Sequence, residues 1–283
     1  MYSGFISKTH TVSILGIHQR FDMAAYHMIE QYLPKQAFPE LKDILHFEGY
    51  NGPDGLKVKS RGSHEPSHLY DPISDTGAVP MHIEHHYNAM VEKLSRGDLV
   101  RAAFEASWMA HYIGDGMTPA HHFPLEEKVA QAAARATDGL KNGDVSKFSS
   151  FLKKNWAIWG VKGHLSTHFN FEMGAALAML VFPIRPVFDE AELVRARQLG
   201  PVAYFKAEAL DVANLHLYER FYHDGWTNEI AREVKNKIAP QAARAIGMIW
   251  LLALLEAGQV VVLRGEQSVA QSLAKSITEQ PAA

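Results

Sequence analysis

Apolar residues recur at helical spacing along most of this chain, and that pattern constrains its fold more than any other feature. In residues 98–114 the apolar side chains fall three or four positions apart: Leu99, Ala102, Ala103, Ala106, Met109, Ala110 and Ile113. This is the pattern of an amphipathic helix with one buried face. The same spacing predicts helices over residues 18–33, 39–47, 80–94, 125–140, 145–159, 165–181, 190–222, 227–257 and 269–278. Alternating strand-like runs are scarce. We therefore expect an all-α fold, a single-domain multi-helix bundle over residues 1–283.

Composition limits the chemistry that such a bundle can carry. The net charge of −3 gives no electrostatic reason to expect binding to nucleic acid or to an anionic membrane. The chain has no cysteine, which excludes disulfides, thiolate metal sites and thiol nucleophiles together. Histidine is the abnormal count, because the chain has 16, and ordinary usage would give roughly half as many. A bound metal would therefore use His, Asp and Glu.

The hydropathy pattern predicts neither a signal peptide nor a membrane-spanning helix. Residues 1–17 lack the basic region and apolar run of a signal peptide, so we expect a cytoplasmic rather than a secreted protein. The strongest apolar run, residues 246–263, contains Glu256 and Gln259. It falls short of a membrane-spanning helix and predicts a buried core helix.

One long segment departs from the helical pattern. Residues 48–79 are rich in Gly, Pro, Ser, Asp and His and show no periodicity. A loop of this length inside a compact domain is usually functional or disordered. Its aromatic residues and histidines favour a loop that contributes to a site.

The end of the helix predicted at residues 98–114 places metal-ligating side chains together. His111 and Asp115 stand at positions i and i+4, so both side chains leave the same helix face. Gly116 and Pro119 then break the helix, and the chain turns to present His121. An isolated pair of this kind is more often an ordinary capped helix end. Two imidazoles and a carboxylate on a rigid helix end nevertheless suit zinc.

Other segments supply further candidate ligands. They are His18 in the first helix, Asp54 and His68 in the irregular loop, and His168 with Glu172 at i, i+4 in a later helix. With His111, Asp115 and His121 the set exceeds what one four-coordinate zinc requires. We expect two or three clustered ions in a cleft between helices, with Asp115 placed to bridge neighbouring ions.

At these residues the chain resembles the zinc-dependent phospholipase C family, whose fold also serves the fungal single-strand-specific nucleases. The central segment matches every fixed position of the family pattern H-Y-x-G-D-x-x-x-P-x-H with His111, Tyr112, Gly114, Asp115, Pro119 and His121. His168 and Glu172 match the later H-x-x-x-E pair. His18 with Ala25, and Pro53-Asp54 followed by His68-Leu-Tyr-Asp71-Pro72, resemble the first-helix histidine and the loop ligands. The resemblance spans roughly residues 16–175.

The resemblance implies three zinc sites. One would use Asp54, His68, His111 and bridging Asp115, and a second would use His121, His168 and Glu172. The third would use His18 and Asp115, completed in the family by an N-terminal tryptophan. Here the chain departs from the pattern, because Met1 lies seventeen residues before His18 and the first tryptophan is Trp108. His10 is an alternative ligand, although an ordinary surface or packing role fits it better.

A second departure is the separation of 47 residues between His121 and His168. It leaves room for an inserted helical pair, about residues 125–160, that would shape the substrate cleft. Several histidines also compete with the chosen ligands. His64, His82, His85 and His86 are alternatives to His68, His122 is an alternative to His121, and His164 stands one turn before His168. For His27 and His46 we expect structural roles, since neither has a partner at ligand spacing.

The function that the resemblance implies is phosphoester hydrolysis by a metal-bound hydroxide, most similar to phospholipase C. Asp54 is the candidate catalytic base that orients the attacking water, unless it is only a ligand. No Ser, Cys or Lys constellation indicates covalent catalysis. Two alternatives stay open: a nuclease or nucleotidase on the same metal core, and a noncatalytic metal-binding member of the family. We expect a phospholipid rather than a nucleic-acid substrate, peripheral membrane contact, no transmembrane segment and no obligate protein partner.

Overall fold

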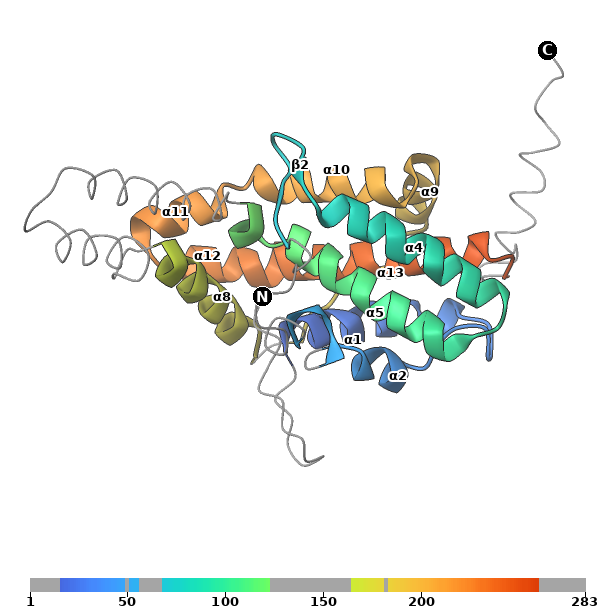
Figure 1. The fold of residues 1–283 in the computed structure, drawn as a ribbon. Helices are drawn as coiled ribbons and strands as arrows, with labels where there is room; N and C mark the ends of the chain where they lie inside the picture. Colours follow the sequence, from blue (N-terminus) through green and yellow to red (C-terminus); the bar gives the residue numbers. More distant parts are fainter. Residues whose placement is uncertain (1–15, 49–50, 56–67, 123–163, 181–182, 260–283) are drawn as a thin grey trace, which may run out of the picture.

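Helices that lie side by side along a common direction make up most of the molecule (Figure 1). The computed structural model describes residues 16–48, 51–55, 68–122, 164–180 and 183–259, except for the side chains of residues 164–169 and 179–180. The predicted helices at 125–140, 145–159 and 269–278 lie outside the described residues, as does the predicted insertion at 125–160. The all-α prediction is confirmed.

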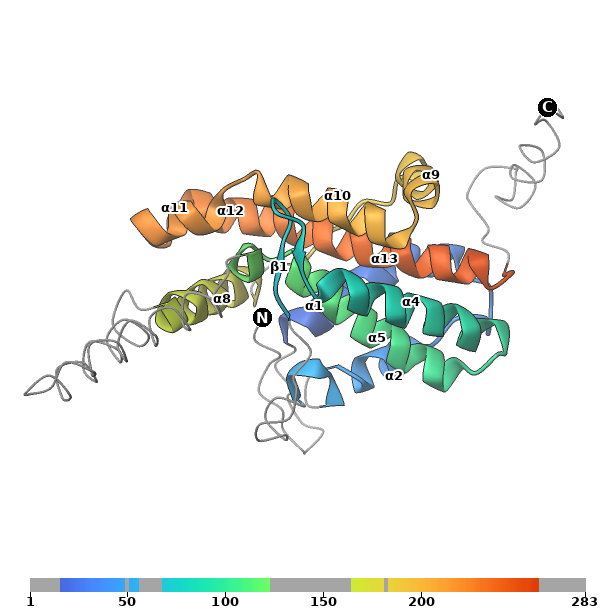
Figure 2. The same cartoon turned by 45° about the horizontal axis from the view of Figure 1, so that its top comes forward.

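The first half of the described chain includes four helices that pack around the site. Helix α1 (Ile17–Ile29) continues into the short 3-10 turn η1 (Glu30–Tyr32), and α2 (Leu41–His46) follows after Pro39. Helices α4 (Val79–Ser95) and α5 (Leu99–Gly116) are joined by a tight turn at Gly97, which has a positive φ of 71°. They lie side by side in both views (Figures 1 and 2). The turn η3 (Pro119–His122) closes this half.

The loop predicted over residues 48–79 contains a small hairpin. Strands β1 (Tyr70–Asp71) and β2 (Thr76–Gly77) pair antiparallel, with Tyr70 opposite Gly77. Gly77 has a φ of 127°, and a Cβ there would lie 2.3 Å from the carbonyl oxygen of Leu69. Only glycine therefore fits this position.

The second half begins with α8 (His164–Leu180) and then departs from one prediction. The single helix expected over residues 190–222 is wrong, because the chain forms α9 (Glu190–Leu199), α10 (Pro201–Ala213) and α11 (Leu217–Asp224). The first break, between α9 and α10, occurs because Gly200 has a φ of 78° and Pro201 starts a new helix. His216, with a φ of 49°, lies at the second break.

The last helical run forms the centre of the core. Helix α12 (Asn228–Glu233) is capped by the preceding Thr227, whose hydroxyl accepts a hydrogen bond from the Ile230 N–H at 3.2 Å. It continues through the π-helical turn η4 (Val234–Ile238) into α13 (Ala239–Glu256). This 29-residue run is long enough to cross a membrane, and its most apolar 18-residue window has a mean hydropathy of 1.6, but 78% of that window is buried inside the protein. That burial is what the predicted core helix requires.

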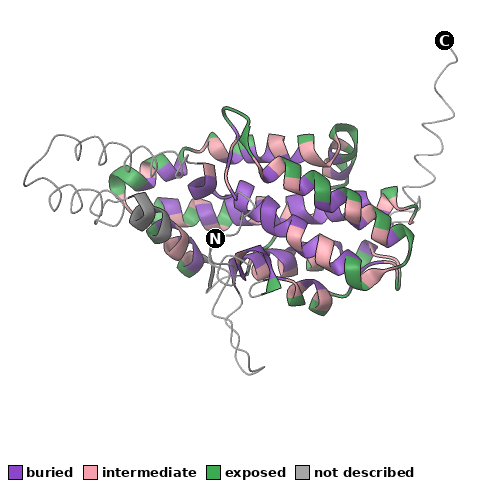
Figure 3. Ribbon diagram, viewed as in Figure 1, coloured by how far each residue is buried: buried purple, intermediate pink, exposed green. Residues whose placement is uncertain are grey.

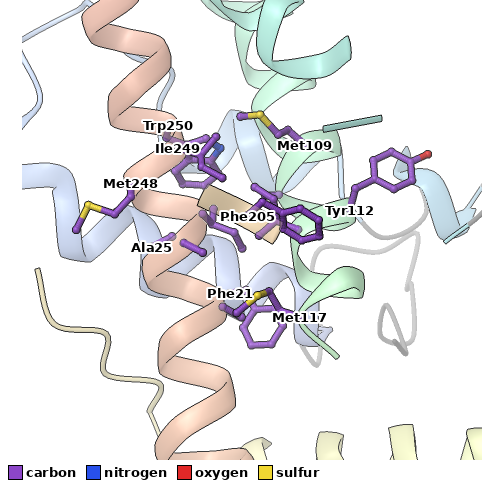
Figure 4. Packing of buried hydrophobic residues seen from close by; sticks show 14 of the residues in the cluster. Phe21, Ala25, Met109, Tyr112, Met117, Phe205, Met248, Ile249 and Trp250 are labelled. Atoms are coloured by element: carbon purple, nitrogen blue, oxygen red, sulfur yellow. The ribbon is translucent and has the colours of Figure 1, made fainter. Parts of the chain in front are cut away.

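Helices α1, α4, α5, α9 and α10 pack against α13. Buried residues form stripes along the inward sides of the ribbons, and exposed residues line the outer sides (Figure 3). Trp250 of α13 is fully buried, packs against Phe38 at 5.9 Å between ring centroids, and donates a hydrogen bond to the carbonyl of Ala106 at 3.1 Å. Figure 4 shows Trp250, Ile249 and Phe205 in this core between the helices. The packing fixes α5 against α13 and thereby positions the site.

Candidate metal centre

The C-terminal end of α5 carries the central residues of the candidate metal centre. His111 and Asp115 are both fully buried, and their atoms Nε2 and Oδ2 lie 3.2 Å apart. Helix α5 is capped at its start by Asp98, whose side chain accepts a hydrogen bond from the Arg101 N–H. Its end is tightened by the Thr118 hydroxyl, which donates to the Gly114 carbonyl at 2.8 Å. The helix therefore delivers both side chains rigidly and from one face, as their spacing predicted.

Helix α1 places His18 against the same turn of α5. The rings of His18 and His111 are stacked with centroids 4.0 Å apart. This contact explains why position 114 is glycine, since a Cβ there would lie 2.9 Å from Nδ1 of His18 and 3.2 Å from the ring of Phe21. The glycine leaves the space that the His18 imidazole occupies.

The carboxylate of Asp115 lies at the centre of four imidazole rings. Its Oδ1 is 3.3 Å from Nε2 of His18 and 3.5 Å from Nε2 of His121. Its Oδ2 is 2.5 Å from Nδ1 of His68 and 3.2 Å from Nε2 of His111. Histidines from α1, the hairpin segment, α5 and η3 thus meet at both oxygens of one carboxylate.

The β1–β2 hairpin fixes His68, which precedes it by two residues. The carbonyl of His68 accepts a hydrogen bond from Nδ1 of His121 at 2.9 Å, so one ligand candidate orients another. Tyr70 packs on Phe205 of α10 with ring centroids 5.5 Å apart. The Tyr70 hydroxyl and the Lys206 ammonium both donate to Asp75 at 2.9 Å. These contacts hold the hairpin, and with it His68, against α10.

Asp54 and Glu172 lie at the edges of the cluster. Oδ1 of Asp54 is 3.8 Å from Nε2 of His111, and Oε1 of Glu172 in α8 is 3.0 Å from Nε2 of His121. Their side chains are 19% and 14% exposed, whereas those of His111 and Asp115 are fully buried. His168 lies one turn before Glu172 in α8, but its side chain is not among the described residues. The structure therefore brings together seven of the eight predicted ligands and leaves His168 a prediction.

Most of the alternative histidines have other neighbours. His82 stacks on Tyr112 at 4.5 Å, and Nδ1 of His86 pairs with Glu105 at 2.7 Å. His85 is exposed on α4 and packs against the His86 ring. Nε2 of His122 donates to the carbonyl of Gly116 at 2.7 Å. His27 and His46 are exposed, as expected for residues outside a site. His10 and His64, and the side chain of His164, lie outside the described residues.

Charges within the cluster shift the pKa values of its members. Burial by itself raises the pKa of Asp115, yet the facing imidazoles of His121, His111 and His68 hold it well below its ordinary value. Burial by itself lowers the pKa of His111, but the carboxylates of Glu48, Asp115 and Asp54 raise it well above 6.5. The pKa of Asp54 is also lowered, because the nearby imidazoles outweigh its burial. The carboxylates of Asp115 and Asp54 are therefore ionised at neutral pH.

The donor atoms fit a divalent metal ion of borderline softness. Two groups, His18 with Asp54 and His111, and His68 with His111 and Asp115, place their ligand atoms within 4.8 Å of one another. Within the described part of the chain, neither ring nitrogen of the buried His18 has a hydrogen-bond partner, and Nε2 faces the Asp115 carboxylate at 3.3 Å. A buried polar atom without a partner is costly unless a ligand satisfies it. Imidazole nitrogens with carboxylate oxygens and no sulfur suit zinc.

Two buried carboxyl groups beneath the cluster were not predicted. Oε1 of Glu48 lies 3.0 Å from Nδ1 of His111, and both side chains are fully buried. Asp22 is buried in α1, and burial together with the charge of Glu48 raises its pKa well above its ordinary value. The spacing of His18 and Asp22, at i and i+4, is a signal that could have found Asp22. No local pattern marks Glu48.

Comparison with known proteins establishes the fold. No protein-family profile and no curated protein sequence matches this chain. Among solved structures it is similar to the alpha-toxin of Clostridium absonum, with a TM-score of 0.56, 13% identity, and coverage of 86% of this chain and 64% of the toxin. A Clostridium perfringens alpha-toxin from an avian strain gives a TM-score of 0.55, 15% identity, and coverage of 87% and 65%.

The chain has the fold of the clostridial alpha-toxins. At this level of identity the likeness establishes the fold alone, and it confirms the phospholipase C fold that the sequence motifs predicted. The chain spans 64% and 65% of the length of the two toxins. Buried His and Asp side chains that could hold a metal lie within that fold.

Proposed function

We propose that this protein is a zinc-dependent phosphodiester hydrolase of the phospholipase C type. One observation carries the proposal: four histidines from four separate segments face the two oxygens of the buried Asp115 carboxylate. A structural ion pair needs one imidazole, and four around one carboxylate is the arrangement of a bridging metal ligand. The alpha-toxin fold supports the same assignment.

The residues present divide into three groups of zinc ligands. Asp54, His68, His111 and Asp115 would hold one ion, His121, Glu172 and His168 a second, and His18 with Asp115 a third. Zinc bound there supplies Lewis-acid chemistry, lowering the pKa of a water and polarising a phosphate oxygen. Two ions suffice for the proposed reaction.

The chain's own side chains orient the reactants. Asp115 is fully buried and ionised, so it would balance part of the positive charge of the metals from the buried side of the cluster. Asp54 is ionised and reaches the solvent-facing edge of the cluster. We therefore assign Asp54 the role of accepting a hydrogen bond from the attacking water and directing it at phosphorus. The exposed edges at Asp54 and Glu172 are where a phosphodiester would enter.

Phospholipid head groups are the substrate class that we propose. The net charge of −3 gives no electrostatic reason to expect a polyanionic nucleic acid. A phospholipid presents a single phosphodiester at a membrane surface, so peripheral contact with that surface belongs to the same proposal. Hydrolysis of nucleic acid is the alternative outcome of the test.

The test combines metal analysis with hydrolysis assays. Purified protein should contain at least two zinc ions per chain and should hydrolyse phosphatidylcholine in vesicles and bis-p-nitrophenyl phosphate. The substitution Asp115→Asn should lower the zinc content by the ions that Asp115 would hold, and it should lower hydrolysis by at least about 100-fold, the upper end for loss of a residue that only orients a ligand. Asp211→Asn, on an exposed position of α10, is the matched control and should change neither.

Three results would contradict parts of the proposal. Fewer than two zinc ions per chain would exclude a zinc-dependent hydrolase of this design. Zinc-loaded protein that cleaves single-stranded nucleic acid but not phosphatidylcholine would show that the substrate is nucleic acid and not phospholipid. Loaded protein that cleaves none of these substrates would indicate a noncatalytic metal-binding protein.

A further inference from the structure

Glu48 lies directly behind the histidine at the centre of the cluster. Its Oε1 is 3.0 Å from Nδ1 of His111, on the side of the ring away from Asp115. Both side chains are fully buried, so water does not compete for this contact. The other ring nitrogen of His111, Nε2, faces Asp115 at 3.2 Å and Asp54 at 3.8 Å.

The backbone around Glu48 is fixed by contacts with two helices. The ring of Phe47 packs edge-on against Phe104 of α5 with centroids 5.6 Å apart. The side-chain amide of Gln19 in α1 donates to the carbonyl of Leu45 at 3.4 Å. Glu48 therefore stands at a defined position between α1 and α5, and its carboxylate is not a mobile surface group.

The chemistry of imidazole gives this contact a consequence for metal binding. A neutral ring carries one N–H and one lone pair, and the group that accepts the N–H decides which nitrogen is free. In the neutral ring that binds a metal, Glu48 would accept from Nδ1 and leave the lone pair of Nε2 directed into the cluster. A carboxylate at this place also raises the basicity of the nitrogen that binds the metal.

We infer that Glu48 is a positioning residue that holds His111 in the tautomer and orientation needed for metal binding. The inference rests on the proposed function, since it assigns His111 as a metal ligand. It extends the site to a residue that neither the motifs nor the fold comparison assigns. Glu48 itself does not touch the reacting atoms.

The chain contains a matched control for this contact. His86 and Glu105 form the same type of pair, with Nδ1 of His86 2.7 Å from Oε2 of Glu105. The two side chains are 8% and 13% exposed. The rings near His86 include those of Trp108 and Tyr112. Neither His86 nor Glu105 is part of the two metal-ligand groups found among the described residues. A purely structural imidazole–carboxylate pair should behave like this one.

The experiment compares three variants of the full chain: Glu48→Gln, Glu48→Ala and Glu105→Gln. Zinc affinity is measured by competition with a chromophoric chelator. We expect Glu48→Gln to weaken zinc binding about 10-fold and Glu48→Ala up to about 100-fold, the range for loss of a residue that orients a ligand. Glu105→Gln should leave zinc affinity unchanged. In ¹⁵N-histidine spectra of the zinc-loaded protein, the Nδ1–H signal of His111 should be lost in Glu48→Ala.

Several results would overturn the inference. Equal zinc affinity in the wild type and Glu48→Gln, or an equal loss of affinity in Glu105→Gln, would mean that Glu48 is only a buried hydrogen-bond partner of His111 and does not position it for metal binding. If Glu48→Ala fails to fold, the affinity of Glu48→Gln, which conserves the volume, decides. A wild-type protein that binds no zinc overturns the inference and the proposed function together. Zinc binding without phosphodiester hydrolysis overturns the function only, and the affinity comparison still decides the role of Glu48.

Discussion

Single residues around α5 show how closely the sequence is fitted to the site. Gly114 is required by the ring of His18, because any Cβ there would come within 2.9 Å of Nδ1. Gly116 meets a similar limit, since a Cβ would lie 2.3 Å from Cζ of Phe205. Both glycines have helical neighbours and no positive φ. They are therefore needed for close approach of side chains and not for backbone freedom.

His122 gives a prediction of pH dependence at this scale. Burial lowers its pKa to about 4, while in the unfolded chain the pKa is the ordinary 6.5. Between these values the unfolded chain binds the proton and the folded chain does not, so acid favours unfolding. The stability due to neutral His122 is thus fully present above pH 6.5 and is lost as the pH falls towards 4. We expect a loss of about 1–2 kcal/mol, discounted for partial exposure.

The measurement is urea unfolding of chelator-treated protein at pH 7, 6, 5 and 4. His122→Gln keeps a donor for the Gly116 carbonyl but does not titrate. Its free energy of unfolding should therefore fall less than that of the wild type over this range. Parallel curves for the two proteins would show that His122 is not held neutral by the fold.

At the scale of elements, prediction succeeded where a relation is local in sequence. His111 and Asp115 were placed on one face because a helix fixes the direction of residues four apart. The break at Gly200–Pro201 was missed, because apolar spacing on both sides of it continues as if one helix ran through. Glu48 was missed for a different reason. Its partner His111 is 63 positions away, and only packing of α2 against α5 brings the two together.

Phe205 of α10 joins two of the elements that carry ligands. Its ring is fully buried, packs on Tyr70 of the hairpin and touches the space above Gly116 at the end of α5. We expect Phe205→Leu to lower the free energy of unfolding by about 1–2 kcal/mol, because it leaves a partly filled cavity. We also expect weaker zinc binding, since His68 and Asp115 lose a common support.

Phe38→Leu is the matched control for this prediction. Phe38 is also buried in the core, where it packs on Trp250 and Tyr26. Its substitution should reduce stability by a similar amount and leave zinc affinity as in the wild type. The two variants are compared by urea unfolding and by chelator competition. Equal zinc affinities in both would mean that the hairpin and the end of α5 do not depend on Phe205.

At the scale of the whole molecule, the cluster joins segments that are far apart in the chain. His18, His68, Asp115 and Glu172 come from α1, the segment before the hairpin, α5 and α8, and they meet in one cluster. In the metal-free site Asp54 and Asp115 are ionised, and the pKa of His111 is raised. Because the ligands come from both halves of the bundle, a bound ion would act as a cross-link between those halves.

Removal of zinc should accordingly lower the stability of the whole fold. A ligand that binds only the folded state adds about 4 kcal/mol at a free concentration 1,000 times its Kd. For a chain of this size each kcal/mol corresponds to about 2–4 °C in Tm, so chelation should lower Tm by about 8–16 °C. Thermal unfolding with and without EDTA measures the shift, and added zinc should restore Tm while magnesium does not. Asp115→Asn should show a smaller zinc-dependent change in Tm than the wild type, because it would keep only the ion held by His121, Glu172 and His168. A wild-type Tm unaffected by EDTA, or an equal zinc-dependent change in that variant, would show that Asp115 does not hold a metal that stabilises the fold.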